Sequence, residues 1–169
     1  MKRRSLLKLG LGAAVLVGVA GGGIALMKPG LVDNKLSPDA QALMRAVALA
    51  TLDGVWPADA AKRDADLTRH IAQLDVAIAA LPQATRSELS QLLALLTSGV
   101  GRRTMAGLAP DWKDASAAEV AAAMQDMRFS SLAPRQQIYQ ALRELNCVVF
   151  FTESSHWGLV GYPGPREIA

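Results

Sequence analysis

Apolar side chains recur at steps of three and four through most of the chain, which is the period of a helix with one buried face. The clearest run is Leu67, Ile71, Leu74, Ile78 and Leu81, which predicts a helix over residues 66–81 that Pro82 ends. Similar patterns predict helices over residues 37–54, 85–98, 116–128 and 132–152. No alternating run is long enough to indicate a strand. The sequence therefore predicts an all-α bundle of about five helices over residues 37–152.

Polar residues mark where several of these helices begin. Ser37 is suited to accept a hydrogen bond from a free amide of the first turn, and Pro38 fits the first helical position. Residues 85–88 and 116–119 both match the capping box, in which two polar side chains bond the first free amides. These positions predict the starts of the first, third and fourth helices.

Four stretches lack the helical period. Residues 29–36 contain Pro and Gly and are predicted to be a tether, and the charged residues 58–66 a connection. Residues 99–115 are rich in Gly and are predicted to be a loop or a broken helix. From residue 153 to residue 169 Gly, Pro and aromatic residues are dense, which predicts an extended, turn-rich C-terminal tail.

A basic region followed by an apolar run opens the chain, which is typical of an export signal. Nothing acidic precedes Asp33. The basic region resembles the twin-arginine (Tat) export motif through Arg3, Arg4, Leu6, Leu7 and Lys8. Residues 1–28 are therefore predicted to be a Tat signal, read by the Tat translocase, that directs the protein to the periplasm. The alternative is an ordinary secretory signal that carries two arginines.

Whether this leader is removed stays open at the level of sequence. A small-residue cleavage site is present at residues 23–25, which favours removal. The apolar run from Leu9 to Met27 has a length close to that of a hydrophobic signal helix able to span a bilayer, which favours retention as an anchor at the inner membrane.

Charge and cysteine content narrow the function classes. The leader holds five of the 18 basic residues and no acid, so the rest of the chain carries 13 basic and 15 acidic residues. A nucleic-acid-binding domain needs a basic face, so nucleic acid is not an expected partner. Cys147 is the only cysteine and lies in an apolar run. It is interpreted as a buried small side chain, with an intermolecular disulfide as the alternative.

The candidates for chemistry are few. His70 lacks a second ligand at helical spacing and is interpreted as a surface or packing residue. His156 lies close to Glu153 and to two serines, but the members of a catalytic triad converge from separate elements. Arg102 and Arg103 could hold an anion or an acidic patch of a partner, or be solvated charge. Asp59, Asp64 and Asp66 are interpreted as one solvated acidic loop rather than a calcium site. No catalytic, cofactor-binding or metal-ligating residue is predicted.

The C-terminal tail is the most informative stretch, because it places aromatic residues in irregular chain. Such a segment must dock on something to be ordered, either on its own bundle or on another protein. Trp and Tyr are common anchors of interfaces. The residues predicted to bind a partner are Trp157, Gly161, Tyr162, Pro163, Gly164 and Pro165.

The leader, the small helical body and this terminal block together resemble the gluconate 2-dehydrogenase subunit 3 family, the small subunits of membrane-associated flavin-dependent dehydrogenases. The resemblance implies a large subunit that binds FAD and oxidises the substrate, and a multihaem cytochrome c subunit that often takes the electrons. It also implies that the small subunit carries no cofactor, stabilises its partner and lends it the export signal.

Two alternatives remain at this point. The first is a stand-alone exported enzyme or ligand-binding protein, with His156, Glu153 and Tyr162 near a pocket. The second is an exported structural protein that binds lipid or another part of the envelope, and it depends on an uncleaved leader.

Overall fold

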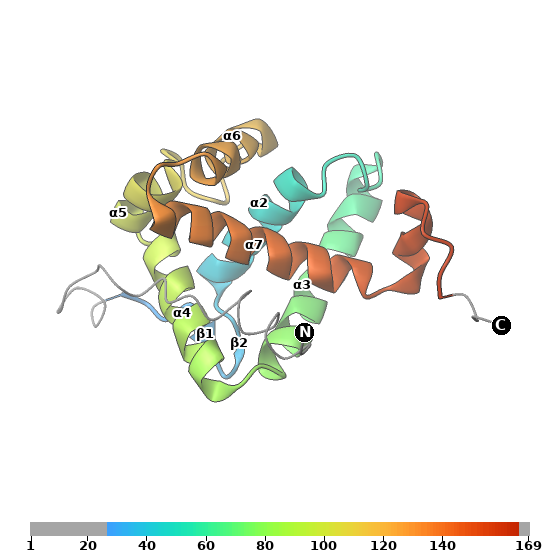
Figure 1. The fold of residues 1–169 in the computed structure, drawn as a ribbon, viewed down its shortest axis with the longest axis horizontal. Helices are drawn as coiled ribbons and strands as arrows, with labels where there is room; N and C mark the ends of the chain where they lie inside the picture. Colours follow the sequence, from blue (N-terminus) through green and yellow to red (C-terminus); the bar gives the residue numbers. More distant parts are fainter. Residues whose placement is uncertain (1–26, 166–169) are drawn as a thin grey trace.

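The computed structural model describes residues 27–165, and helices dominate that part of the chain (Figure 1). Five of them have 12 or more residues: α2 (Pro38–Thr51), α3 (Ala60–Ala79), α4 (Gln83–Thr97), α6 (Ala117–Arg128) and α7 (Ala133–Phe151). The prediction of a helical bundle of about five helices is confirmed for these residues. The predicted signal helix lies outside the described residues.

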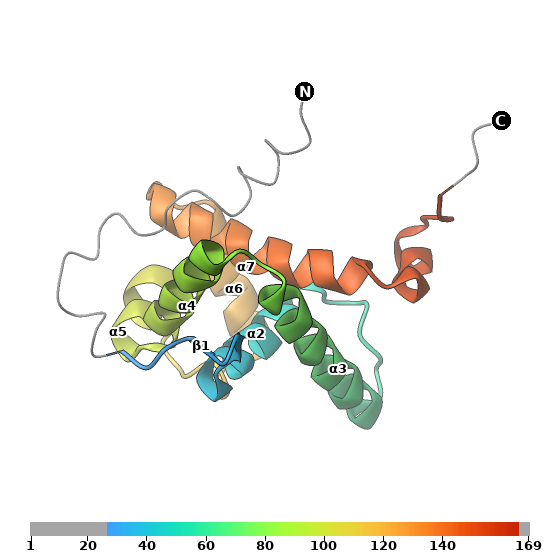
Figure 2. The same ribbon diagram turned by 90° about the horizontal axis from the view of Figure 1, so that it is seen from below.

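The core forms around α2. The side chains of Leu43, Met44 and Val47 are fully buried, and α2 contacts α3, α4, α6 and α7. Figure 1 shows α7 running across α2, and Figure 2 shows α3 and α4 diverging on another side of it. Leu74 and Ile78 of α3 contribute the apolar face that the sequence predicts for this helix.

Two predicted helix starts are confirmed. The Ser37 side chain accepts a hydrogen bond from the amide of Ala40 at 3.3 Å, and Pro38 is the first residue of α2. At the start of α6, Ser116 and Glu119 form the predicted capping box, with bonds of 2.8 and 3.2 Å. Both caps satisfy amides that have no partner within the helix.

The prediction that residues 58–66 form a connection is wrong beyond Asp59. The Asp59 side chain accepts the amide of Lys62 at 2.8 Å, and α3 begins at Ala60. The first turns of α3 are largely exposed up to Leu67, so they carry no apolar stripe that could mark them as helical.

The predicted capping box at residues 85–88 does not form, because α4 begins earlier, at Gln83. Pro82 takes the extended conformation that precedes a helix, without a side-chain cap. The Arg86 side chain turns back instead and donates hydrogen bonds to the carbonyls of Ala79, at 3.1 Å, and Leu81. It thereby satisfies free carbonyls near the end of α3.

The predicted tether is a hairpin that packs on the bundle. Strands β1 (Leu31–Val32) and β2 (Lys35–Leu36) pair antiparallel. Asp33 and Asn34 both have positive φ, as a two-residue hairpin turn requires. The Leu31 amide donates to the Ser90 hydroxyl at 3.1 Å and the Leu36 amide to the Asp75 carboxylate at 2.8 Å. The strands are too short to show an alternating pattern in the sequence.

Residues 99–115 form the predicted broken helix. A short helix, α5 (Gly99–Gly101), continues into η2 (Arg102–Ala106), a turn of π-helix that Gly107 ends with φ 74°. The loop that follows buries Leu108 and Trp112 in the core.

The C-terminal tail is not wholly extended. Residues Ser154–Val160 form a 3₁₀-helix, η3, directly after α7. In both views η3 lies at one end of the molecule, away from α5 (Figures 1 and 2). Within residues 27–165, no helix combines the length and apolar character that crossing a membrane requires.

Candidate functional site

Residues 153–165, called here the C-terminal segment, fold on themselves around Trp157. The Trp157 indole donates a hydrogen bond to the carbonyl of Phe151, the last residue of α7, at 2.9 Å. The Tyr162 ring packs edge-on against the Trp157 ring, with 5.3 Å between centroids, and the Tyr162 amide donates to the Trp157 carbonyl at 3.0 Å. Gly161, with φ 70°, makes the turn between them.

The residues predicted to bind a partner therefore divide into two groups. Trp157 and Gly164 serve the internal packing of the segment, because Gly164 is buried beside the indole. Gly161, Tyr162, Pro163 and Pro165 are exposed.

Three large side chains with apolar surface are exposed in this segment and are called here the apolar tip. Leu159 is 54% exposed, Val160 59% and Tyr162 48%. Sequence reasoning singled out only Tyr162 of these three. The sequence gives no sign that Leu159 and Val160 are exposed. Their exposure follows from the 3₁₀-helical turn of the segment.

The base of the segment is fixed to the bundle. The Glu153 carboxylate accepts a hydrogen bond from the Gln73 amide of α3, and the His156 ring stacks on Phe150 at 3.9 Å between centroids, with 10° between planes. The tail thus docks on its own bundle only in part. Its base contacts α3 through Gln73 and α7 through Phe150, whereas Val160 and Tyr162 of the apolar tip are exposed and the half-exposed Leu159 borders a cavity.

A cavity of about 230 Å³ lies where this base meets the bundle. Aromatic residues from three places form much of its wall: Trp56 after α2, His70 in α3, and Phe150 with His156 around the end of α7. Glu153, Ser155 and Leu159 line it from the C-terminal segment, whereas Tyr162 does not. The structure therefore brings Glu153 and His156 to a pocket, as the stand-alone alternative expects, and leaves Tyr162 outside it.

His70 is a buried packing residue. Its side chain is 2% exposed, and its Nε2 lies 3.0 Å from the Asn146 side-chain oxygen, whose own amide nitrogen donates to the Leu142 carbonyl at 2.9 Å. Burial lowers the pKa of His70, and the nearby charge of His156 adds to this effect, while Asn146 and Glu153 oppose it. His70 is therefore a neutral imidazole at neutral pH.

His156 does not form a nucleophile–base pair. Its Nδ1 bonds the Phe150 carbonyl at 2.6 Å, and its Nε2 lies 3.5 Å from a Glu153 oxygen. Across the described residues, no hydrogen bond joins Ser154 or Ser155 to this ring. In the same part of the chain no group of three His, Cys, Asp or Glu side chains could hold a metal ion.

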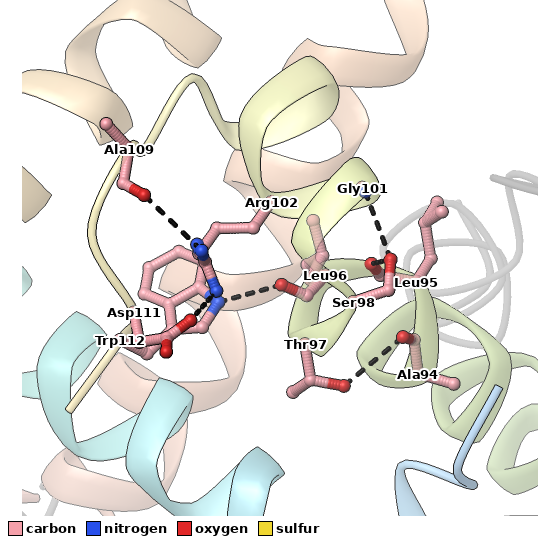
Figure 3. Close-up of polar contacts among 10 residues, drawn as sticks. All are labelled: Ala94, Leu95, Leu96, Thr97, Ser98, Gly101, Arg102, Ala109, Asp111 and Trp112. Atoms are coloured by element: carbon pink, nitrogen blue, oxygen red, sulfur yellow. Dashed lines mark hydrogen bonds and ion pairs between the residues drawn. The ribbon is translucent and has the colours of Figure 1, made fainter.

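Arg102 and Arg103 lie in different environments. Arg102 is neither solvated charge nor available for an anion or an acidic patch of a partner, so those interpretations are wrong for it. Arg102 is 6% exposed, forms an ion pair with Asp111 and donates to the Ala109 carbonyl at 3.3 Å (Figure 3). It holds the loop after η2 against the bundle, whereas Arg103 is exposed. An acid nine positions after the arginine gives no recognisable spacing, so the sequence could not reveal this pair.

The three aspartates predicted to share a loop lie on α3 or at its start, each with its own partner. Asp59 caps the helix, Asp64 forms an ion pair with Arg45, and Asp66 forms one with Arg69 at 2.6 Å.

Cys147 is half-buried, and burial raises the pKa of its thiol, while the charge of Arg143 opposes this effect. Its surroundings thus resemble those of a packing thiol more than those of a reactive thiolate.

Arg3, Arg4, Leu6, Leu7 and Lys8 of the predicted export signal lie outside the described residues. Comparisons with protein-family models, with curated protein sequences and with solved structures give no match.

Proposed function

We propose that this chain is the non-catalytic small subunit of a periplasmic, flavin-dependent dehydrogenase. It binds and stabilises the FAD-containing large subunit, in a chaperone-like manner, and supplies the Tat signal for the export of both. The complex acts on CH–OH groups at the inner membrane, and a multihaem cytochrome c subunit accepts its electrons. The resemblance of the leader and the terminal block to the gluconate 2-dehydrogenase subunit 3 family is the source of this proposal.

The observation that carries the proposal is the exposed apolar tip on a fixed base. Leu159, Val160 and Tyr162 extend from a segment that is held by the Trp157–Phe151 hydrogen bond and by the stacking of His156 on Phe150. Side chains that are already ordered lose little conformational freedom on binding, which favours affinity. Apolar side chains that gather in a large exposed patch mark protein interaction sites, and these three lie within four positions of one another in the chain.

The carrier role is tested by co-expression with an FAD-dependent oxidoreductase that has no signal of its own, sought first in the reading frame next to this chain's gene. Changing Arg3 and Arg4 together to Lys should leave both subunits in the cytoplasm, because the twin-arginine pair is the element that the receptor reads. The matched control is Lys2→Arg, which keeps both the charge and the pair, and it should export both subunits. An active large subunit in the periplasm with the double change would contradict the proposal.

The cavity supports the alternative of a stand-alone ligand-binding protein, because Glu153 and His156 line it together. A folded, monomeric chain that binds no oxidoreductase but retains a small molecule would favour that alternative.

A further inference from the structure

A second pair of exposed apolar side chains lies at the other end of the molecule from η3. The connection between α6 and α7 carries Phe129, which is 76% exposed, and Leu132, which is 59% exposed. In both views the start of α7 lies on the same side of the molecule as α5, whereas η3 follows the far end of α7 (Figures 1 and 2). The length of α7 therefore separates this pair from the apolar tip.

The connection that carries this pair is fixed by its own contacts. The Leu132 amide donates to the Ser130 hydroxyl at 3.2 Å, and the Gln136 side chain donates to the Ser130 carbonyl at 2.7 Å. The Arg128 guanidinium lies over the Phe129 ring, 5.1 Å from its centroid. A surface that is already ordered loses little conformational freedom on binding, which favours affinity.

Three arginines accompany the two apolar side chains. Arg128 ends α6, and the amide of Arg135, in the first turn of α7, donates to the Leu132 carbonyl at 3.0 Å. The Arg135 side chain donates to the Met105 carbonyl of η2 at 2.8 Å, which places the exposed Arg103 of η2 at the same end of the molecule. These five residues are called here the basic end: Arg103, Arg128, Phe129, Leu132 and Arg135.

The positive charge of the basic end is only partly compensated. Among residues 27–165, no carboxylate forms an ion pair with Arg103, Arg128 or Arg135. Asp126, the acid nearest to the connection in the sequence, is exposed and leaves an excess of two positive charges. A symmetric contact between two copies through this surface would bring like charges together, which costs free energy. An anionic surface matches the charge of the basic end better than a second copy does.

An anionic bilayer matches both the apolar and the basic side chains of this end. Side chains such as Phe and Leu enter the boundary between lipid headgroups and acyl chains, and basic side chains are attracted to anionic lipids. Each arginine near such a surface strengthens binding about fivefold.

We propose that the basic end docks on the surface of an anionic lipid bilayer. Phe129 and Leu132 enter the headgroup boundary, and the three arginines contact lipid phosphates. The apolar tip then lies at the opposite end of α7 from the bilayer, about 28 Å away along a helix of 19 residues. The contact needs neither the oxidoreductase partner nor the export signal, so it stands independently of the proposed function.

Fluorescent labels at the two ends of the full-length chain test this contact. Ser131→Cys places a label between Phe129 and Leu132, and Ser154→Cys places one in the C-terminal segment, where the serine is exposed as well. Both changes are made together with Cys147→Ser, so that each chain has one attachment site. The label is nitrobenzoxadiazole, whose emission rises on transfer from water to lipid.

The emission at the Ser131 position should rise with vesicles of phosphatidylcholine and phosphatidylglycerol in equal amounts, but not with phosphatidylcholine alone. The label at the Ser154 position should not respond. Equal responses at the two positions or to the two vesicles, or no response at the Ser131 position, would overturn the proposal. A rise without vesicles that grows with protein concentration would assign the surface to a second copy and would also overturn it.

Two double variants separate this contact from any binding of the leader to the vesicles. Phe129→Ser with Leu132→Ser should abolish the response of the label at the Ser131 position. Arg103→Gln with Arg128→Gln should raise the lipid concentration at half-maximal response about thirtyfold, or about fivefold for each arginine. A retained response in the first variant, or an unchanged midpoint in the second, would overturn the proposal.

Each double variant has a matched control with exposed side chains elsewhere on the bundle. The apolar control is Val76→Ser on α3 with Val148→Ser on α7, and the charge control is Lys62→Gln near the start of α3. Both controls should respond to lipid as the unmodified chain does. An equal loss in the controls would show that the response does not belong to the basic end and would overturn the proposal.

Discussion

Two segments outside the five long helices use the same anchoring contact in opposite environments. In the loop after η2, the Trp112 indole donates to the carbonyl of Leu96, in the last turn of α4, at 2.8 Å. In the C-terminal segment, the Trp157 indole donates to the carbonyl of Phe151, at the end of α7, at 2.9 Å. Each tryptophan thus fixes a segment outside the five long helices to a helix end whose carbonyls lack partners within the helix.

The difference lies in what surrounds each anchor. Trp112 is 4% exposed and belongs to the core, and the nearby ion pair of Arg102 with Asp111 closes its loop further (Figure 3). Trp157 is half-buried and supports the exposed apolar tip of Leu159, Val160 and Tyr162. The first segment therefore completes the fold, whereas the second presents a surface.

The largest expected difference is between the two tryptophan variants. Trp112→Ala should lower the free energy of unfolding by about 3–5 kcal/mol, as large-to-small core changes do. Trp157→Ala should cost about 1–2 kcal/mol, since it removes one hydrogen bond and partial burial. It should instead weaken binding to the proposed large subunit by about 2–4 kcal/mol, because the apolar tip loses its support.

Urea denaturation and an affinity measurement separate these two costs. Equal losses of monomer stability in both variants would mean that the C-terminal segment serves the core of its own bundle.

Gly101 and Gly158 allow the same comparison, one beside the buried loop and one in the exposed C-terminal segment. A Cβ on Gly101 would lie 2.0 Å from the Leu95 carbonyl oxygen, a contact that only a backbone shift can relieve, whereas a Cβ on Gly158 would meet nothing within 4 Å. Gly101→Ala should destabilise the protein by about 1–3 kcal/mol. Gly158→Ala should change stability by about 0.5 kcal/mol or less. Thermal unfolding of both variants checks this, and a large effect at Gly158 would show that the segment packs more tightly than its exposure indicates.

A smaller effect concerns pH at the base of the C-terminal segment. Burial holds the pKa of His70 below its ordinary 6.5, so the unfolded chain takes up a proton first as the pH falls. The stability contributed by neutral His70 is complete above pH 6.5 and is lost as the pH falls toward the lower pKa of the folded state.

His70→Gln keeps a side chain that can bond Asn146 but does not titrate. Urea midpoints measured across this pH range should depend less on pH in the variant. An unchanged dependence would assign the effect to other groups.

The sequence was sufficient to predict the helical bundle but not the hairpin before it or the exact start of α3. The apolar period of α3 and the caps of α2 and α6 are local patterns, and the structure bears them out. The hairpin at residues 31–36 could not be predicted because it depends on distant partners, Ser90 and Asp75. The start of α3 could not be predicted because its exposed first turns have no buried face.

The candidate site divides in the same way. The density of Gly, Pro and aromatic residues indicates the C-terminal segment, but no sequence pattern joins Trp56, His70 and Phe150 into one cavity. Those residues come together only through the packing of α3, α7 and the connection after α2. For Arg102 the sequence suggested a charge free to bind an anion or a partner, whereas the structure buries it in an ion pair with Asp111.

The most direct test measures how tightly the chain binds the proposed FAD-containing large subunit after Leu159 and Val160 are both changed to Ser. Both side chains are more than half exposed, so stability should change by about 0.5 kcal/mol or less per site. Affinity should fall by about thirtyfold or more, corresponding to about 2 kcal/mol. The matched control is Val76→Ser on α3, an apolar side chain that is 73% exposed, and it should bind as the unmodified chain does. Unchanged affinity in the double variant would contradict a docking role for the C-terminal segment.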